Sequence, residues 1–593
     1  MRLEEMKVQI GNRFGILAES DTRQLTVIAV NSDVAVGDMF LLPCNRGRER
    51  FYIFRTTQYA NILNRTLEMN DVARNKLTLP DSYFAEDLRD EQLIELTGIV
   101  LGYSERDDAS GQWTFHRPRR LPQHLSEVFR VQDHPLTNDV VNELLRKELH
   151  PDGLYVGDLL AGESPLPGVG IHIPAYAFSH HIGIFGRTGC GKSNLMMVLL
   201  RSIMQHNHAV QKGEKTEAKV SIFAIDPHDE FNRWHAHTGG SDGLHGIVRS
   251  YGADERKKLV APFYYLTLKN RGEDPFEETV RLSRADAVPD DFISVMEFSE
   301  QQVAFAQYFY SDHGERWIPD LLLNNFEEKS LGGEGAVEYL PGTVAAVQRR
   351  VSCLRSSNTR LFTLYDPECG YDYDSSLPDI VCALENGRVL DVDTTLMNEV
   401  EQFLLTTIVA RVLFSLRKAL KSAEGAFSLP EEILKAFGND DSTKQKGMRR
   451  FAEVLLEKLD TGELPYVRGE EMVSLDDLPF INIVIEEAPS ILNPQRMRFG
   501  SVYRDISRQG RKFGIGLTVI SQQVSELDQG ILTQLNTEFT MALGNENERR
   551  EAIRNASADL QGFERELQVM GKGQAILSAS YKDVPLPIQA PEF

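Results

Sequence analysis

The sequence predicts an α/β protein that combines a core of buried parallel strands with a small N-terminal β-barrel and a mainly helical insertion. Near-continuous apolar runs that end at acidic or polar residues are typical of parallel strands covered on both faces. Short β-rich runs fill the first hundred residues, and a glycine-rich turn joins one apolar run to an apolar helical stretch. The five apolar runs cover residues 182–185, 220–225, 388–392, 481–485 and 515–520.

The N-terminal region predicts a β-barrel over residues 1–105. Turn residues separate its short β-rich runs, which cover residues 8–10, 14–18, 25–30, 38–42, 51–56 and 96–103. Several short strands at this spacing suit a small barrel or sandwich. From 106 to 170 the composition turns polar, with the basic run RPRR and several prolines, which indicates a linker with one short helix near residues 138–147.

The remaining chain divides into core segments and excursions. Charge patterning and aromatic residues predict a mainly helical insertion, and a polar, highly charged stretch predicts a second excursion. The expected order is the first part of the core at 171–270, the insertion at 271–387, a core strand and helix at 388–422, the polar excursion at 423–477, the second part of the core at 478–550 and a C-terminal tail at 551–593.

The overall composition favours a cytoplasmic globular protein. The chain has no apolar run of about 18 residues, and its N-terminus lacks the apolar stretch of a secretory signal. Its five cysteines form no CxxC pair, so neither a zinc site nor a disulfide framework is indicated. The net charge of −23 argues against a surface devoted to nucleic acid, since phosphate attraction needs clustered Lys and Arg. A ring could still combine an acidic exterior with a basic channel.

The strongest chemical signal is a phosphate-binding loop between a strand and a helix. Its glycines let backbone N–H groups turn towards a β-phosphate, Lys192 would reach the β and γ oxygens, and the Ser193 hydroxyl would ligate Mg²⁺. The alternative, an ordinary glycine turn, does not require this placement. The predicted cofactors are therefore ATP and Mg²⁺, bound by Gly186, Arg187, Thr188, Gly189, Cys190, Gly191, Lys192, Ser193 and Asn194.

Acidic residues end two of the predicted strands. Glu486 and Glu487 follow the run at 481–485, and ligands of α/β sheets bind at the carboxyl ends of strands. We expect Glu486 to act on the metal and Glu487 on the attacking water, although the residues alone leave the assignment open and a charged turn is the alternative. Asp226 and Glu230 follow the run at 220–225 and compete for a place in the nucleotide site.

Two further segments carry candidate catalytic side chains. The basic segment RQGRK contains Arg511, whose guanidinium could reach a γ-phosphate across a subunit boundary. Gln522 follows the last core strand, where an amide could sense the γ-phosphate. Solvated basic residues and a polar strand end are the alternatives for the two segments.

Taken as an ordered set, these segments resemble the HerA family of hexameric ATPases, within the larger group that includes FtsK-type DNA pumps. The matching pieces are GRTGCGKSN, DPHDEF, VIEEA, SRQGRKFGIGLTVISQQ and VPLPI. The barrel-like first hundred residues also look like the barrel that precedes this ATPase core. One departure is Asp229, which occupies the position usually held by glycine in the DPxGE motif and puts the roles of Asp226 and Glu230 in doubt.

The resemblance implies a RecA-like fold and a homohexameric ring that moves double-stranded DNA through its channel, with the C-terminal tail packed on the ring. It also implies catalytic roles for Lys192, Glu486, Glu487, Arg511 from a neighbouring subunit, and Gln522. Family members act with a nuclease or another effector enzyme, such as an NAD-consuming one, in DNA end processing or antiphage defence, and we expect such a partner on the barrel face. An ATP-dependent scaffold or switch and a secretion or conjugation ATPase are the alternatives.

Overall fold

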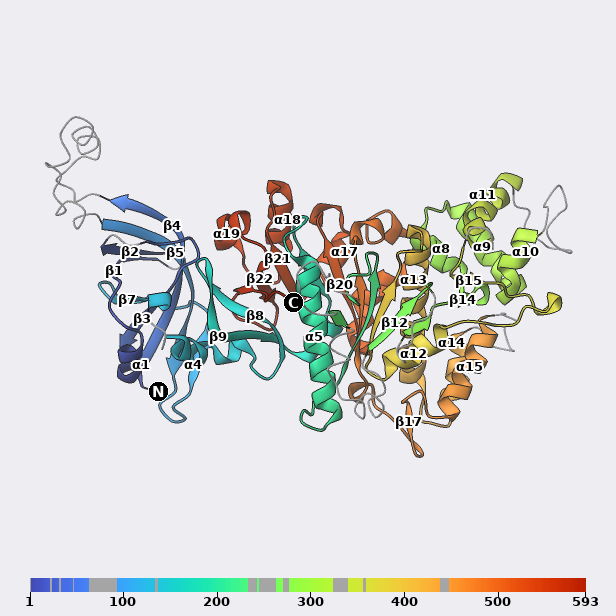
Figure 1. The fold of residues 1–593 in the computed structure, drawn as a ribbon, viewed down its shortest axis with the longest axis horizontal. Helices are drawn as coiled ribbons and strands as arrows, with labels where there is room; N and C mark the ends of the chain where they lie inside the picture. Colours follow the sequence, from blue (N-terminus) through green and yellow to red (C-terminus); the bar gives the residue numbers. More distant parts are fainter. Residues whose placement is uncertain are drawn as a thin grey trace. The chain divides into compact units, whose positions relative to one another are not determined.

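The computed structural model of the protein describes residues 2–21, 24–30, 33–45, 47–62, 93–133, 137–232, 243–244, 263–269, 277–323, 340–355, 359–437 and 447–593. They form two compact units, each assembled from separate stretches of the chain (Figure 1). Unit 1 contains Met1–Pro174, Ile184–Leu199 and Asn536–Phe593, and unit 2 contains Ala175–Gly183 and Leu200–Leu535. Strand β10 (Ile182–Phe185) and helix α5 (Lys192–Gln211) have residues in both units.

A closed β-barrel forms the N-terminal part of unit 1. Its six antiparallel strands follow the order β2-β1-β7-β3-β4-β5, and pairing of β2 with β5 closes the sheet. In β2 buried residues alternate with exposed or half-buried ones, which places one face of the strand in the barrel core. The strands are β1 (Gly15–Ser20), β2 (Gln24–Val30), β3 (Met39–Asn45), β4 (Glu49–Ile62), β5 (Leu93–Arg106) and β7 (Glu127–Arg130).

The prediction of a linker at 106–170 is wrong, because almost all of this stretch is folded. It contains β6 (Trp113–His116), β7, α4 (Thr137–Leu149), β8 (Leu154–Ala161) and β9 (Ser164–Ile173). The basic run lies in the connection between β6 and β7, and the prolines of β9 are tolerated because β9 is the last strand in its sheet. The short helix expected near 138–147 is confirmed as α4, whereas the β-rich run at 8–10 overlaps helix α1 (Leu3–Gln9).

The C-terminal residues are sheet strands of unit 1 and not a tail. Strand β21 pairs with β22, β22 with β23, β23 with β8, and β8 with β9, all antiparallel. Residues 154–173 and 537–589 therefore build one sheet, which sequence spacing alone could not reveal. These C-terminal elements are β21 (Thr537–Met541), α18 (Glu546–Asn555), α19 (Glu564–Val569), β22 (Gln574–Ala579) and β23 (Leu586–Gln589).

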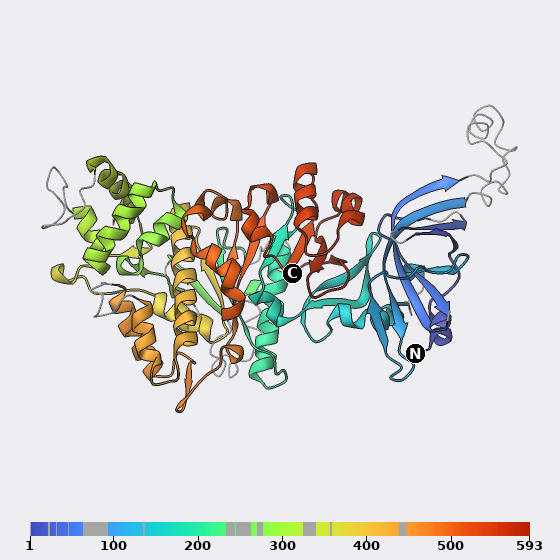
Figure 2. The ribbon, with the colours of Figure 1, turned by 180° about the vertical axis from the view of Figure 1, so that it is seen from behind.

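Unit 2 contains a parallel sheet in the order β13-β12-β16-β11-β19-β20. Every residue of β11 and β20 is buried, as expected for strands covered on both faces. The long helix α13 (Glu399–Ser422) belongs to this unit and is the gold helix in Figure 2. The strands are β11 (Val220–Asp226), β12 (Phe263–Thr267), β13 (Glu277–Thr279), β16 (Val389–Asp393), β19 (Phe480–Ile485) and β20 (Ile515–Ser521), so all five predicted apolar runs are strands, whereas β12 was missed.

Helices dominate the rest of unit 2, including the predicted insertion. Short strand pairs join β14 (Leu282–Ser283) to β15 (Phe362–Thr363) and β17 (Val467–Arg468) to β18 (Glu471–Met472). No helix in the described ranges is both long and apolar enough to cross a membrane. The helices are α8 (Pro289–Val295), α9 (Glu300–His313), α10 (Trp317–Leu323), α11 (Pro341–Val351), α12 (Leu377–Glu385), α13 (Glu399–Ser422), α14 (Leu429–Ala436), α15 (Arg449–Asp460), α16 (Val502–Gln509) and α17 (Gln529–Leu532).

Candidate functional site

The predicted phosphate loop runs from the end of β10 to the first residue of α5. Gly189 and Gly191 have φ angles of +75° and +107°, values that glycine adopts without steric cost. A Cβ on Gly191 would also lie 3.1 Å from the backbone nitrogen of Gly573. These glycines shape the loop so that its N–H groups and the N-terminus of a 20-residue helix can face one anion.

Backbone hydrogen bonds connect this loop to the C-terminal segment of unit 1. The backbone N–H of Arg187 donates to the carbonyl of Ala542 at 2.9 Å, and that of Gly573 donates to the carbonyl of Cys190 at 2.8 Å. Burial raises the pKa of the Cys190 thiol. Cys190 therefore contributes its backbone to the loop, whereas its side chain belongs to the interior of unit 1.

The side chain of Asn194 is likewise used within the fold. It donates to the carbonyl of Pro591 at 2.8 Å and accepts from the N–H of Phe593 at 3.1 Å. The first turn of α5 is thus tied to the end of the chain. The proposed contact of Asn194 with nucleotide stays a prediction, and its side-chain amide has these other partners.

Lys192 and Ser193 are the first residues of α5, and their side chains are suited to binding a nucleoside triphosphate. The ammonium of Lys192 donates to the carbonyls of Gly186 at 2.9 Å and Arg187 at 3.2 Å, so it lies across the loop in which phosphates would sit. A glycine-shaped loop, a helix N-terminus, an ammonium and a hydroxyl are the donor set that ATP with Mg²⁺ requires.

Glu486 and Glu487 lie at the carboxyl end of β19 in unit 2, as the sequence predicted. Glu486 is half-buried and Glu487 is exposed. Glu487 has φ +46° and ψ +44° and makes no side-chain cap for the turn that follows. Left-handed backbone at a residue other than glycine stores strain, and such strain is concentrated at functional sites. This conformation marks Glu487 as a candidate functional residue.

Asp226 ends β11 and organises the turn that follows it. Its carboxylate accepts from the N–H groups of His228 at 3.1 Å and Phe231 at 2.7 Å. Burial raises its pKa to about 6, against the opposing effect of these backbone donors. Glu230 lies half-buried in the same turn, so Asp226 positions the turn on which Glu230 is carried.

Asp229 does not add an unpaired carboxylate to the site. It accepts hydrogen bonds from the Tyr265 hydroxyl at 2.9 Å and the Lys269 ammonium at 3.0 Å. Both donors also reach Asp393, at 3.1 Å and 2.8 Å. The sequence analysis missed Tyr265, Lys269 and Asp393. Asp393 could have been found as an acidic end of the predicted strand at 388–392.

Arg511 and Gln522 lie at opposite edges of the parallel sheet. Arg511 precedes the start of β20, and Gln522 follows its end. Because β19 and β20 are parallel, Gln522 lies at the same end of the strands as Glu486. At about 3.3 Å per residue, such strands separate the two edges by roughly 20 Å. Arg511 instead lies near His180, whose pKa falls to about 4 through burial and this positive charge. Within one subunit Arg511 therefore cannot join Glu486.

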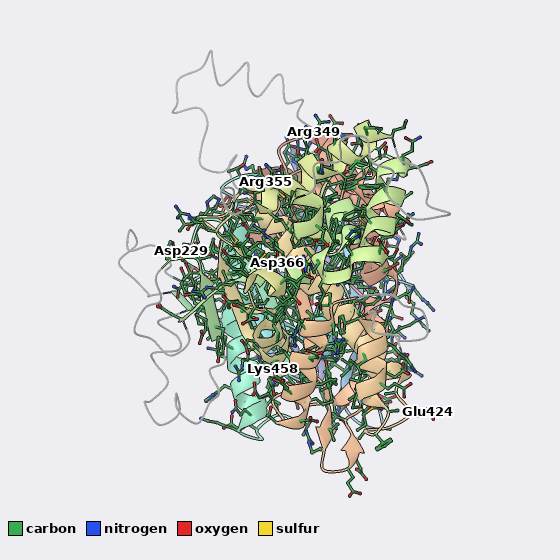
Figure 3. The ribbon with its side chains drawn as sticks, turned by 90° about the vertical axis from the view of Figure 1, so that its right-hand side faces the viewer. Asp229, Arg349, Arg355, Asp366, Glu424 and Lys458 are labelled. Carbon is green, nitrogen blue, oxygen red and sulfur yellow. The ribbon has the colours of Figure 1, made fainter. Side chains whose placement is uncertain are left out.

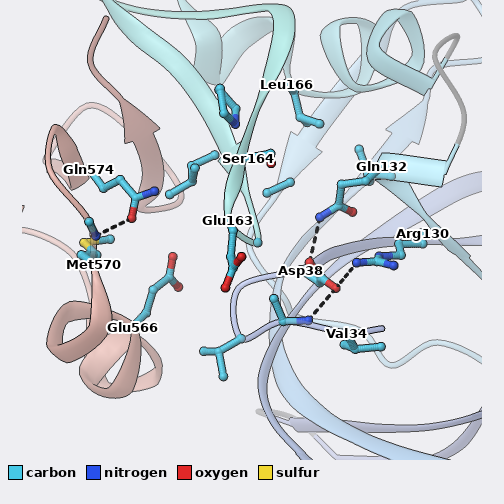
Figure 4. A pocket seen from close by; sticks show the side chains of 18 of the residues that line it. Val34, Asp38, Arg130, Gln132, Glu163, Ser164, Leu166, Glu566, Met570 and Gln574 are labelled. Carbon is cyan, nitrogen blue, oxygen red and sulfur yellow. Dashed lines mark hydrogen bonds and ion pairs between the residues drawn. The ribbon is translucent and has the colours of Figure 1, made fainter. Parts of the chain in front are cut away.

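A separate cavity of about 1180 Å³ lies in unit 1, and none of its lining residues belongs to the phosphate loop (Figure 4). The Asp38 carboxylate on its wall accepts from Arg130 at 2.7 Å and from Gln132 at 2.9 Å. Glu566, also in the wall, forms an ion pair with buried Arg55. The acidic groups of the wall that are buried therefore have partners within unit 1.

Comparison with known proteins finds relatives of low sequence identity along most of the chain. The family described as "Helicase HerA, central domain" matches residues 154–366. The "Probable DNA double-strand break repair helicase HerA" of Methanocaldococcus jannaschii is 24% identical over 490 residues, covering 80% of this chain and 82% of that protein. The "DNA double-strand break repair helicase HerA" of Pyrococcus furiosus is 20% identical over 573 residues, covering 95% and 89%.

Among solved structures, the chain is similar to VirB4 of Thermoanaerobacter pseudethanolicus, with a TM-score of 0.38 and 12% identity over 74% of this chain and 96% of that one. It is also similar to the plasmid coupling protein TrwB in complex with ADP and Mg²⁺, with a TM-score of 0.41 and 12% identity over 71% and 88%. These values are too low to support an argument about function. The phosphate loop and the parallel sheet give the chain a P-loop ATPase core, and the relatives found by sequence show that it is similar to HerA helicases, with residues 154–366 matching the HerA central domain.

Proposed function

We propose that the protein is a cytoplasmic, ATP-hydrolysing ring motor that translocates double-stranded DNA. The observation that carries this proposal is the match, over 80% and 95% of the chain, to two proteins named DNA double-strand break repair helicases. The residues at the ends of β10, β11, β19 and β20 fit the ATPase part of that activity. A homohexamer is the assembly that the family resemblance implies.

The proposed roles divide between phosphate binding and hydrolysis. Lys192 would neutralise phosphate charge, and Ser193 and Glu486 would hold Mg²⁺, which when bound would supply charge stabilisation to the phosphoryl group. Glu487 takes a proton from the attacking water. Gln522 senses the γ-phosphate from the same sheet edge as Glu486.

We assign Arg511 to the site of a neighbouring subunit. A guanidinium roughly 20 Å from its own acidic strand ends serves hydrolysis only if another subunit's nucleotide comes to it. Ring motors with ATP at subunit interfaces supply this arrangement, and an arginine provided in trans stabilises the charge of the transition state.

DNA contacts are expected from exposed cations that are not used within the fold. On the insertion, Arg350 donates to the carbonyl of Glu297 at 2.8 Å and stacks 5.0 Å from the ring of Phe298, which makes it structural. Arg349 and Arg355 are exposed (Figure 3). We propose Arg349 and Arg355 as phosphate contacts in an otherwise acidic protein.

A partner is expected to supply the second chemistry, as a nuclease or another effector enzyme in DNA end processing or antiphage defence. The net charge of −23 favours one alternative, an ATP-dependent scaffold or switch that regulates an effector without moving DNA. The two functions differ in whether DNA changes the rate of ATP turnover.

The deciding experiment is steady-state ATP hydrolysis by the purified chain with and without double-stranded DNA, with Lys192→Ala as the blank. Stimulation by DNA that disappears in Lys192→Ala is expected. Turnover that depends on Lys192 but is indifferent to DNA, both alone and with candidate partners, would favour the scaffold or switch.

A further inference from the structure

Asp391 is a carboxylic acid buried inside the sheet of unit 2. It lies in β16, opposite Ala224 of β11 and Tyr265 of β12. Its exposed fraction is 0%, and neither of its carboxyl oxygens has a hydrogen-bond partner among the described residues. An ionised carboxylate without partners is costly to bury, so this side chain requires an explanation beyond packing.

The neighbours of Asp391 are predominantly acidic. Asp226 of β11 lies opposite Asp393 of β16, two residues further along the strands than Ala224 and Asp391. Because alternate strand residues share a face, Asp226 and Asp393 lie on the same face of the sheet as Asp391. Burial raises the pKa of Asp391 well above its usual range, and so do four nearby carboxylates, namely Asp226, Asp229, Asp393 and Glu486.

The nearby cation already has two other carboxylates as partners. Lys269 Nζ lies 3.0 Å from Asp229 Oδ2 and 2.8 Å from Asp393 Oδ2. In the part of the chain that the structure describes, no group of three or more His, Cys, Asp or Glu side chains is arranged to hold a metal ion. The neutral acid is therefore the favoured form of Asp391, and a neutral carboxyl group has one O–H to donate.

We propose that Asp391 is a positioning residue for ATP hydrolysis, which as a neutral acid donates a hydrogen bond to the carboxylate of Asp226. This inference rests on the proposed roles of the acidic strand ends. Asp226 already accepts the N–H groups of His228 and Phe231 and has lone pairs for another donor. In the structure the carboxyl oxygens of Asp391 have no partner among the described residues, so the proposed bond requires a rotation of this side chain or one bridging water.

The consequence of this bond is a fixed turn at residues 226–231. An O–H donor to an ionised carboxylate forms a strong, charge-assisted hydrogen bond. It stabilises the anionic form of Asp226 against the effect of burial and keeps the turn that carries Glu230 in one conformation. Asp391 acts through Asp226 and has no direct contact with substrate in this proposal.

The test compares two substitutions at this position in the full chain. Asp391→Asn keeps a neutral donor of the same shape, and Asp391→Val removes the donor at similar volume. We expect the Asn variant to keep kcat within about twofold and to keep the wild-type pH profile. The Val variant should lose about tenfold in kcat, which corresponds to about 1.4 kcal/mol. Its KM for ATP should be unchanged, and the acidic limb of its profile should move to higher pH.

Two results would overturn the proposal. A Val variant with wild-type kcat and pH profile would limit Asp391 to packing, and an Asn variant as impaired as the Val variant would mean that an ionised carboxylate is required. If the Val variant fails to fold, the Asn variant decides, because a neutral Asp391 predicts melting at or above the wild-type temperature at pH 8 and lower melting contradicts it.

Failure of the proposed function is recognised separately. Wild-type protein and Lys192→Ala are assayed in parallel, and absence of Lys192-dependent turnover in the wild type would refute the function. The melting comparison between the wild type and Asp391→Asn would still test the neutral state of Asp391.

Discussion

The strained backbone of Glu487 predicts that stability and activity can be separated at this residue. Its φ of +46° and ψ of +44° lie in the left-handed region, which costs a residue with a Cβ roughly 1–2 kcal/mol. The side chain is exposed, so its removal sacrifices little packing. If Glu487 is the catalytic base, the fold tolerates this strain in order to present a carboxylate.

Three substitutions distinguish strain from chemistry. Glu487→Gly removes both the strain and the carboxylate, Glu487→Ala removes the carboxylate but keeps the Cβ, and Glu487→Gln keeps the side-chain size without the charge. After allowance for the extra freedom of glycine in the unfolded chain, we expect the Gly variant to exceed the Ala variant in stability by roughly 1 kcal/mol. This difference corresponds to a Tm higher by about 2–4 °C for a unit of 150–250 residues.

Turnover should respond differently. All three variants lose the proton acceptor, so kcat should fall by about 10²–10⁴-fold in each, measured as ATP hydrolysis beside Lys192→Ala. Thermal unfolding monitored by calorimetry gives the stability comparison. A Gly variant no more stable than the Ala variant would refute the argument from strain, and a Gln variant with wild-type kcat would refute the role as base.

Other predictions concern buried charge, subunit contacts and pH. Arg55→Ala should destabilise unit 1 by roughly 3–5 kcal/mol because it leaves the buried carboxylate of Glu566 unpaired. Arg48→Ala, at an exposed ion pair with Glu105, should destabilise the protein much less, and equal losses in chemical denaturation would contradict this. The Arg511→Ala and Lys192→Ala proteins should each be inactive. If Arg511 acts across a head-to-tail interface, an equal mixture that exchanges subunits should regain active sites, to roughly a quarter of the number in the wild type. No recovery of ATP hydrolysis would argue against a trans role. Burial raises the pKa of Glu538 to about 8, so its contribution to stability is present at acidic pH and is lost as pH rises through about 8. The Glu538→Gln variant should therefore melt at a higher temperature than the wild type at pH 9 but not at pH 5. Parallel curves of melting temperature against pH for the two proteins would show that Glu538 does not titrate in this way.

Local patterns predicted the parts of the fold that are local. The phosphate loop is specified by glycines within eight residues, and fully buried strands such as β11 and β20 appear as unbroken apolar runs. The strands of unit 1 that pair with strands distant in the sequence have less regular hydrophobic patterns, so the sequence predicted them less well. In β21 the sequence TEFTM mixes polar and apolar residues although all five are buried, so its strand character depends on β22.

In the candidate site, too, some residues can be found from local sequence patterns and others only from the folded structure. Glu486 and Gln522 lie at or next to the ends of apolar runs, and Lys192 lies in the glycine-rich loop that follows one, so all three can be found in the sequence. Asp391 lies within the run VLDVD of β16, and nothing in the sequence shows that its carboxyl group has no hydrogen-bond partner among the residues that the structure describes. That property depends on β11 and β12, which bring their own residues to its sides.

The presence of Asp229 where the DPxGE motif has glycine is explained by the backbone conformation and the hydrogen bonds at this position. Asp229 has φ +56°, the left-handed conformation for which glycine is the usual residue and which Asp adopts more readily than most others. The motif therefore specifies a backbone conformation at this position, and Asp satisfies it at some steric cost. The hydrogen bonds from Tyr265 and Lys269 offset that cost, and they join the turn after β11 to β12 and the segment that follows it, across the intervening strand β16. A glycine would give the same turn without this connection, so the substitution ties the turn that carries Glu230 to the sheet more firmly than the motif alone would.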